Sequence, residues 1–358
     1  MTNYLYNIDF LRFIFILIIM YGHTLGFLQE KCNPELISSL LGQSSVASYV
    51  GIASFFILSG YFLYNSYLKH QETQTKDYFI RRVLRLWPML LVSGVVLIIA
   101  GKFNRMDMLG LFFINAGTGL VNKGLYNGAS WFICVLLFVS TFYYFIITSC
   151  KEKYVLFICS LFSFWGYASI SSSIEESKMA VSLIEGSNWL TLGMVLGLSN
   201  IALGIIIAIL IKNYKSIDIK LKTPVKLLIT IGEISLFGFI LSHILFNKHP
   251  IMILPYWEFL FIILFLLFIF KMGYFSKILN CKFSKILGGC TYSMYILHLP
   301  VLYFLNKYIF KTTQNASWKL IVLYLFICTV IGILAHIFIE RKINKLIDKK
   351  YFKKENHG

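Results

Sequence analysis

Three ionisable side chains interrupt one long apolar segment near the start of the chain. Asp9, Arg12 and His23 lie in the run IDFLRFIFILIIMYGHTLGF, which begins at Ile8 and is long enough to cross a bilayer as a helix. A charged group inside hydrocarbon is costly, so such groups usually face a bundle interior or a reaction path. Because imidazole is a proton acceptor near neutral pH, this segment predicts a catalytic site within the membrane.

Helix geometry places these side chains on one face. The eleven steps from Arg12 to His23 turn a helix by about 1100°, only about 20° beyond three full turns, and rise roughly 16 Å. Asp9 precedes Arg12 by three residues, a spacing at which the two side chains can meet. We therefore predict Asp9, Arg12 and His23 as the catalytic residues, with a paired cation at one end of the helix and an imidazole near the other.

A basic cluster precedes the third apolar segment, in YFIRRVLRLWP. Arg81, Arg82 and Arg85 are typical of positive anchoring at a cytoplasmic membrane surface, with Trp87 as an interface residue. Arg82 and Arg85 also share a helix face, and arginines so placed can bind phosphates through pairs of hydrogen-bond donors. From the residues alone, anchoring is the simpler of the two interpretations.

A polar stripe occurs late in the chain, in GGCTYSMYILHLP. Tyr292, Tyr295 and His298 fall at positions i, i+3 and i+6, near one side of a helix. A single buried histidine indicates ordinary packing, whereas three polar groups on one stripe also favour a site. Trp131, at the start of the segment WFICVLLF, fits an interface position equally well.

Further ionisable residues lie in later apolar segments. Glu233 and His243 are additional candidates, and Glu258 is expected near an outer end, where it could face water. His336 and Glu340 have the i, i+4 spacing at which they can pair with each other.

Glycines in two segments indicate close helix packing. Gly60 follows Ser59 in FFILSGYFL, and Gly193 and Gly197 form a small-xxx-small pattern in NWLTLGMVLG. Both patterns are typical of helices that approach closely within a membrane.

The composition places these segments in a membrane protein. Hydrophobic residues make up 58% of the 358, charged residues only 14%, and the mean hydropathy is +0.74. We predict an all-α, polytopic membrane bundle with about ten transmembrane helices. The predicted spans are about 9–28, 46–68, 83–101, 129–149, 154–171, 188–211, 225–246, 255–271, 287–308 and 319–339.

The charge distribution predicts the orientation. With both termini cytoplasmic, the inner loops and the tail hold 23 of the 33 Lys and Arg, which accounts for the net charge of +17 without a nucleic-acid partner. We divide the chain into a membrane domain, 1–340, and a basic cytoplasmic tail, 341–358. Seven scattered cysteines and the absence of HExxH or clustered acidic residues predict neither disulfides nor a metal site.

Four motifs in order resemble the acyltransferase 3 family, the integral-membrane O-acyltransferases that acetylate bacterial O-antigen, capsule and exopolysaccharide. The segment IDFLR…H, residues 8–23, is similar to the family's opening signature of Arg, ten residues and His. FFILSGYF, RRVLRLWP and GGCTYSMYILHLP are similar to its later elements. The chain departs from the pattern in WFICVLLF, which lacks the glutamate of many members, so no role is assigned to such an acid.

The resemblance implies transfer of an acyl group, usually acetyl from cytoplasmic acetyl-CoA, to a hydroxyl of a cell-surface glycan or its lipid-linked precursor. It implies a multi-pass protein of the bacterial inner membrane, with acyl-CoA, the glycan and the lipid bilayer as partners. His23 would act as general base or as transient acyl carrier, and Arg12, held by Asp9, would orient the donor. Arg82 and Arg85, with Arg81, would bind CoA phosphates. The other cavity candidates are Tyr292, Tyr295, His298 and Trp131.

Two other classes of function remain open. In a transporter or flippase, Arg12, His23, Glu233 and His298 would form a substrate or proton path. Repeated halves with broken spans, which favour a transporter, are absent from the sequence. A membrane scaffold would leave the polar stripe of the first segment without a purpose.

Overall fold

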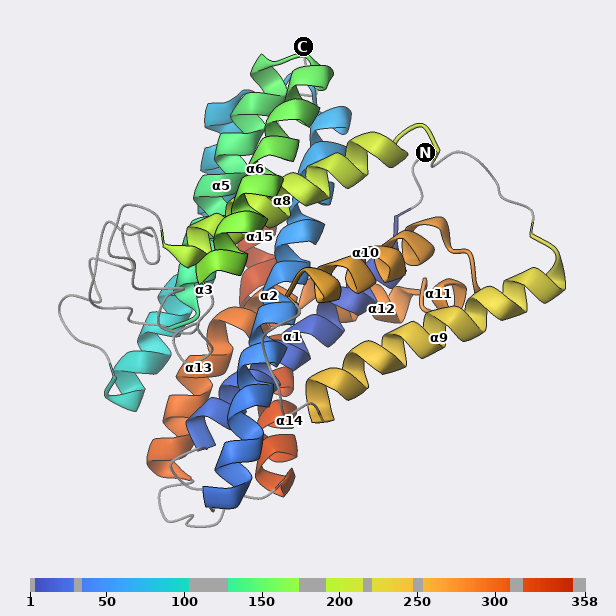
Figure 1. Cartoon of the computed structure of the whole chain (residues 1–358). Coiled ribbons are helices and arrows are strands. Elements are labelled where there is room, and N and C mark those ends of the chain that lie inside the picture. The colour runs from blue at the N-terminus through green and yellow to red at the C-terminus, as the bar shows by residue number, and fades with distance from the viewer. Residues whose placement is uncertain are drawn as a thin grey trace.

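The computed structural model describes residues 4–28, 34–102, 128–173, 191–214, 221–246, 254–309 and 318–349. Every regular element within these ranges is a helix (Figure 1). The helices are α1 (Tyr6–Leu28), α2 (Pro34–Lys69), α3 (Thr75–Ala100), α5 (Ser130–Ser149), α6 (Glu152–Ser173), α8 (Leu192–Ile211), α9 (Thr223–Phe246), α10 (Leu254–Phe270), α11 (Tyr274–Ile278), α12 (Lys282–Gly289), α13 (Thr291–Tyr308), α14 (Trp318–Ala335) and α15 (Arg341–Ile347).

The all-helical fold is the one that the sequence predicts. The described residues of each predicted span fall on a helix or its ends, with 287–308 divided between α12 and α13, whereas residues 188–190 lie outside the described residues. Seven helices of the described part are long and apolar enough to cross a membrane: α1, α3, α5, α6, α8, α9 and the continuous rod Lys319–Ile347. An eighth span is possible if α12 and α13, bent by 43° at their junction, cross as one. The other predicted spans fall on α2 and on the shorter apolar α10, so ten crossings and the cytoplasmic side stay predictions.

Polar side chains inside these helices bond to their own backbone. The Ser59 hydroxyl donates to the Phe55 carbonyl at 2.7 Å, and the Thr329 hydroxyl donates to the Leu325 carbonyl at 2.7 Å. Such bonds to the previous turn satisfy hydroxyl groups that lipid cannot. Polar residues therefore fit into otherwise apolar helices at little cost.

Glycines set the closest contact of the fold, between α2 and α8. A Cβ atom on Gly60 would lie 2.0 Å from the Ile201 carbonyl oxygen, and one on Gly204 would lie 2.0 Å from the Ile57 carbonyl oxygen. Gly197 similarly leaves room for the Val135 side chain, where a Cβ would meet a methyl at 2.4 Å. The predicted close packing is thus confirmed at Gly60, where the backbones of α2 and α8 touch, and at Gly197, which makes room for a side chain of α5.

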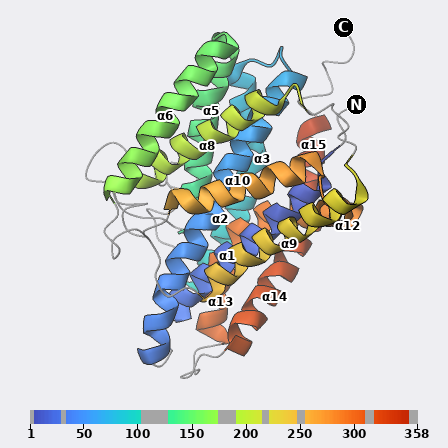
Figure 2. The same ribbon diagram turned by 45° about the vertical axis from the view of Figure 1, so that its right-hand side comes forward.

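Helix α1 lies inside the bundle, where the later helices surround it (Figure 2). It packs against α2, α10, α12, α13 and α14. Gly288 of α12 lies directly against Asp9, since a Cβ there would approach the Asp9 Cγ atom to 2.6 Å. The polar side chains of α1 therefore face other helices.

The C-terminal helices continue α14 without a break. The π-helical turn His336–Glu340 joins α14 to α15, so a helix extends across the predicted boundary at 340. A Cβ on Gly289 would lie 3.1 Å from the His336 Nε2 atom, one residue from the contact between Gly288 and Asp9. The start of α1 and the end of α14 therefore lie on the same side of the bundle.

Candidate active site

Arg12 lies at one end of the polar face of α1, between two partners. Its Nη1 atom is 3.2 Å from the Asp9 Oδ1 atom, and its Nη2 atom donates to the Thr291 hydroxyl oxygen at 3.2 Å. The Thr291 hydroxyl in turn donates to the Gly288 carbonyl at 2.9 Å. The Asp9 side chain is 4% exposed and that of Arg12 is 32% exposed. The predicted pairing of Asp9 with Arg12 is confirmed, and it presents a fixed cation to open space.

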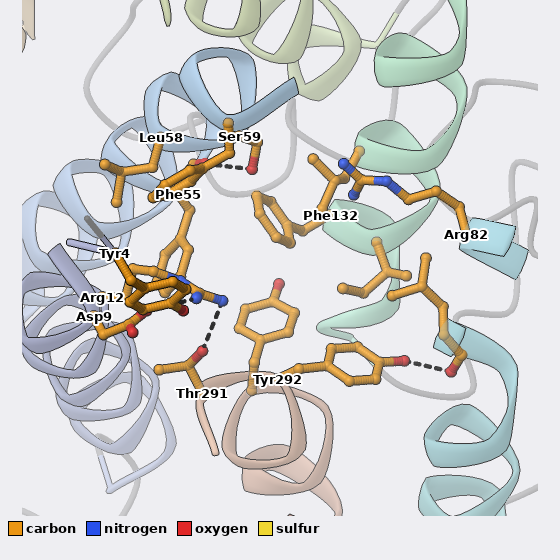
Figure 3. A pocket seen from close by; sticks show the side chains of 15 residues that line it. Tyr4, Asp9, Arg12, Phe55, Leu58, Ser59, Arg82, Phe132, Thr291 and Tyr292 are labelled. Atoms are coloured by element: carbon orange, nitrogen blue, oxygen red, sulfur yellow. Dashed lines mark hydrogen bonds and ion pairs between the residues drawn. The ribbon is translucent and has the colours of Figure 1, made fainter. Parts of the chain in front are cut away.

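That open space is a cavity of about 380 Å³ among α1, α2, α3, α5 and α13. Its wall carries two guanidinium groups, Arg12 and Arg82, which lie on opposite sides in Figure 3. Asp9, which also lines the cavity, offsets the charge of Arg12, so Arg82 supplies the excess positive charge. A positive charge on a largely apolar wall favours an anionic ligand with an apolar portion. The lining residues are Tyr4, Asp9, Arg12, Phe55, Leu58, Ser59, Phe62, Arg82, Leu86, Phe132, Ile133, Leu136, Thr291, Tyr292 and Tyr295.

The three predicted phosphate-binding arginines are separated. Arg82 lines the cavity, with its guanidinium carbon 5.2 Å from the centre of the Tyr78 ring. Arg85 pairs with Asp348 beyond α15 at 2.8 Å, with both side chains about half exposed. Arg81 is not among the residues that line the cavity. Although Arg82 and Arg85 share a helix face, only the Arg82 side chain lines the described cavity.

Tyr4 lies just before α1 at the rim of the cavity. Partial burial, with the Asp9 carboxylate as the second cause, raises the pKa of Tyr4 to about 12. Its phenol is therefore protonated at neutral pH and offers a hydrogen-bond donor beside Arg12.

At the other end of the polar face, His23 meets a second histidine. Its Nδ1 atom lies 2.6 Å from the Nε2 atom of His298, and the two rings meet edge to edge, nearly coplanar at 8°, with centroids 4.9 Å apart. His298 is fully buried, and His23 is partly buried. The candidate His298 is thus a direct partner of His23, which the sequence did not predict.

The partners of this pair assign its tautomers. The His298 Nδ1 atom lies 2.5 Å from the Tyr295 carbonyl oxygen, which can only accept, so Nδ1 of His298 carries the proton. In the neutral ring the Nε2 atom of His298 then accepts a hydrogen bond from Nδ1–H of His23. This leaves the lone pair of His23 on its Nε2 atom. A further bond, from the Tyr324 hydroxyl to the His298 carbonyl at 2.8 Å, holds the backbone of this turn.

Of the other cavity candidates, Tyr292 and Tyr295 line the cavity and Trp131 does not. The Tyr292 hydroxyl donates to the Leu86 carbonyl at 2.5 Å and so ties α13 to α3 (Figure 3). The Tyr295 hydroxyl donates to the Ala129 carbonyl at 2.8 Å, and its ring lies 5.6 Å from that of His298. Trp131 is buried at 4% exposure and is not a lining residue, whereas its neighbour Phe132 is.

Sequence reasoning missed Thr291, Tyr4 and Phe132. Thr291 directly precedes the predicted stripe at Tyr292, so extending that stripe by one residue would have found it. Phe132 is one residue from Trp131, and an apolar side chain gives no signal of its own.

Other predicted candidates have structural partners. Glu233 accepts from the backbone N–H groups of Gly273 and Ser276, each at 3.0 Å, and so satisfies the start of α11. The expectation that Glu258 faces water is wrong, because it is 4% exposed and accepts from the Tyr49 hydroxyl at 2.8 Å. His243 packs on the Trp257 ring, with centroids 4.5 Å apart.

The predicted pair of His336 and Glu340 is confirmed. The His336 Nδ1 atom lies 3.0 Å from the Glu340 Oε2 atom, which also accepts from the Ser293 hydroxyl at 2.5 Å. These contacts tie the end of α14 to α13.

Metal ligands and disulfides were not expected. Within the described ranges, no three His, Cys, Asp or Glu side chains gather as a metal ion would require. The cysteines that the structure describes are free thiols.

The apolar helices, with polar side chains gathered on α1 and α13, define a polytopic membrane protein with an internal polar site. The family model described as "Acyltransferase domain" (Acyl_transf_3) matches residues 5–338. This match identifies the protein class as a membrane acyltransferase. The chain belongs to the acyltransferase 3 family, as its motifs predict. Searches of curated proteins and of solved structures found no match.

Proposed function

We propose that this membrane acyltransferase transfers an acyl group, acetyl in the first instance, from cytoplasmic acyl-CoA to a hydroxyl of a cell-surface glycan or its lipid-linked precursor. The observation that carries the proposal is the hydrogen-bonded pair of His23 and His298, which leaves the Nε2 lone pair of His23 as a base. The inner membrane of a bacterium is the proposed location, because the Lys and Arg distribution fits the positive-inside rule.

The donor is proposed to enter the cavity from the side on which α1 begins. Arg12 and Arg82 supply cationic groups for the phosphates and the polar arm of CoA. The apolar lining at Phe55, Leu58 and Leu136 suits the uncharged arm that carries the thioester. Arg85 is proposed to have only a minor part in donor binding, since its guanidinium pairs with Asp348 outside the lining.

In the proposed reaction, Nε2 of His23 removes the proton from the acceptor hydroxyl. The oxygen attacks the thioester carbonyl, the new C–O bond forms, and the C–S bond breaks to release the thiolate of CoA. The imidazolium then gives its proton to that thiolate, so the charges balance. His298 is proposed to act as a positioning residue, because it fixes which nitrogen of His23 holds the lone pair.

The same nitrogen could instead take up the acyl group and pass it to the acceptor in a second step. Rapid-quench measurements with radiolabelled acetyl-CoA distinguish the two routes. A burst of labelled protein before product appears would establish the covalent route. Product formation without labelled protein would establish direct transfer.

A transporter or flippase fits the described structure less well. That alternative needs Glu233 as part of a proton path, whereas both of its carboxylate oxygens accept backbone hydrogen bonds at the start of α11. The acyltransferase family match also does not favour it.

The proposed function is tested in source cells that lack the gene. Surface and lipid-linked glycans are compared by mass spectrometry after complementation with the wild-type protein, His23→Ala or the empty vector. We expect O-acetylated glycan with the wild type alone, since His23→Ala removes the base. His243→Ala is the matched control, because His243 packs on Trp257 away from the cavity lining.

Equal glycan acetylation with His23→Ala and wild type, at equal amounts of membrane protein, would contradict the assignment of His23. Identical glycans with the wild type and the empty vector would contradict glycan acylation itself.

A further inference from the structure

The cavity and the imidazole pair do not meet directly. On α13 the lining residues end at Tyr295, and the fully buried His298 lies one turn further along the helix. On α1 the lining residues end at Arg12, roughly 16 Å along the helix from His23. An acyl group bound in the cavity must therefore pass the residues at its deep end to reach His23.

Two aromatic rings form that deep end. Phe132 of α5 and Tyr295 of α13 both line the cavity and are 5% and 4% exposed, with ring centroids 5.1 Å apart. The Tyr295 ring is also the direct neighbour of the His298 ring, at 5.6 Å. Tyr295 is therefore the lining residue that reaches the imidazole pair, and Phe132 packs against it.

The two rings differ in how they are held. The Tyr295 hydroxyl is bonded to the Ala129 carbonyl, so turning this side chain would break a buried hydrogen bond. Phe132 has no polar group to satisfy. Its ring packs on Phe56 at 4.6 Å, Phe55 at 6.2 Å and Trp131 at 6.2 Å. Of the two, Phe132 is the ring that can turn aside without the loss of a hydrogen bond.

We propose that Phe132 and Tyr295 form a gate that limits the size of the acyl group that reaches His23, with Tyr295 as its fixed side and Phe132 as its moving side. This proposal rests on the proposed acyl transfer and adds donor specificity to it. A phenyl ring that turns within packed aromatic neighbours clears a small space, which suits acetyl and excludes longer chains.

The partial exposure of His23 agrees with such a gate. His23 is partly exposed although it does not line the cavity, whereas His298 is fully buried. The donor cavity, as its lining residues define it, therefore stops short of His23. A closed ring pair between the cavity and His23 would keep the thioester away from water until the acceptor is bound.

The test uses the full chain in lipid nanodiscs, with acetyl-CoA and hexanoyl-CoA as donors and total membrane glycolipid of the source cells as acceptor. The ratio of kcat/KM for acetyl to that for hexanoyl is measured. Because a single methylene in a fitted pocket is worth about 10–200-fold, we expect Phe132→Ala to lower this ratio by about tenfold or more. Phe132→Leu, which disturbs the packing less, should lower it by a smaller factor.

The matched control is Phe138→Ala, on the same helix but 38% exposed and outside the cavity lining. It should leave the ratio unchanged. Size-exclusion profiles check that each variant is folded, and Phe132→Leu decides the outcome if Phe132→Ala is not.

An unchanged ratio in an active Phe132 variant would overturn the gate and leave the acyl transfer intact. If the wild type transfers no acyl group and titrations show no binding of acetyl-CoA, the proposed function fails and the gate fails with it.

Discussion

The two ends of the polar face of α1 contact the same helix, α13, but offer different chemistry. Arg12 carries a permanent charge, reaches an open cavity and is held by a carboxylate and a hydroxyl. His23 is hydrogen-bonded to a second imidazole, in a chain of hydrogen bonds that ends at a backbone carbonyl. The comparison indicates that ligand binding and proton transfer are separated along one helix, each in the environment that it needs.

An open, charged cavity suits binding because an anion can enter it and replace its water with guanidinium groups. A hydrogen-bonded pair of imidazoles suits proton transfer because its hydrogen bonds determine which nitrogen is the base. If this division is correct, substitutions at the Arg12 end should alter donor affinity, and those at the His23 end should alter the rate.

Replacing His298 tests the imidazole end and should have the largest effect. His298→Ala removes the acceptor that fixes the His23 tautomer, so we expect the transfer rate to fall by about 10²–10⁴-fold with acetyl-CoA affinity unchanged. His298→Gln should retain more activity, because its amide oxygen can accept from Nδ1–H of His23. Initial rates and calorimetric titrations measure both quantities. If His298→Ala weakens acetyl-CoA binding as much as it slows transfer, the two ends of α1 do not divide donor binding from proton transfer.

Arg82 and Arg85 give a matched pair at the cavity end. Arg82→Ala removes a charged donor from the cavity, worth about 1.5–3 kcal/mol, so the Kd for acetyl-CoA should rise about 10–150-fold. Arg85→Ala breaks a half-exposed ion pair with Asp348, worth about 0.2–1 kcal/mol, and should change the Kd by less than about fivefold. Isothermal titration of both variants measures the order. Equal rises in Kd for the two variants would indicate that both arginines bind the CoA phosphates, against the separation described above.

Replacing Thr291 should have a smaller effect than replacing Arg82. Thr291→Val removes one hydrogen bond to Arg12 and leaves the Asp9 pair, at a cost of about 0.5–1.5 kcal/mol, or a rise in Kd of about 2–13-fold. Thr291→Ser keeps the hydroxyl and should bind acetyl-CoA as the wild type does. If Thr291→Val binds acetyl-CoA as tightly as the wild type does, the hydrogen bond from Arg12 to Thr291 is not needed for donor binding.

The sequence predicts what lies within one helix better than what lies between helices. The shared face of Arg12 and His23 follows from a rotation of about 100° per residue, and contacts of both residues with α13 confirm it. The pairs of Asp9 with Arg12 and of His336 with Glu340 follow from helical spacing in the same way.

Contacts between helices depend on packing that spacing does not encode. Arg85 shares a face with Arg82, yet it pairs with Asp348, which lies 263 residues away along the chain. Glu258 is near a predicted span end, yet Tyr49 of α2 covers it in the folded chain. The contact between His23 and His298 likewise requires α13 to pack against α1. The residue types alone do not predict which helices pack together.

The helical register of α1 fixes the spacing of its two functional side chains, Arg12 and His23. Eleven residues separate the guanidinium from the imidazole, and a helix fixes both the distance and the angle between them. One inserted residue between Arg12 and His23 would lengthen the helix by only about 1.5 Å but would swing the imidazole by about 100°, away from His298. The register of this stretch is therefore far less tolerant of insertions than of changes in its apolar side chains.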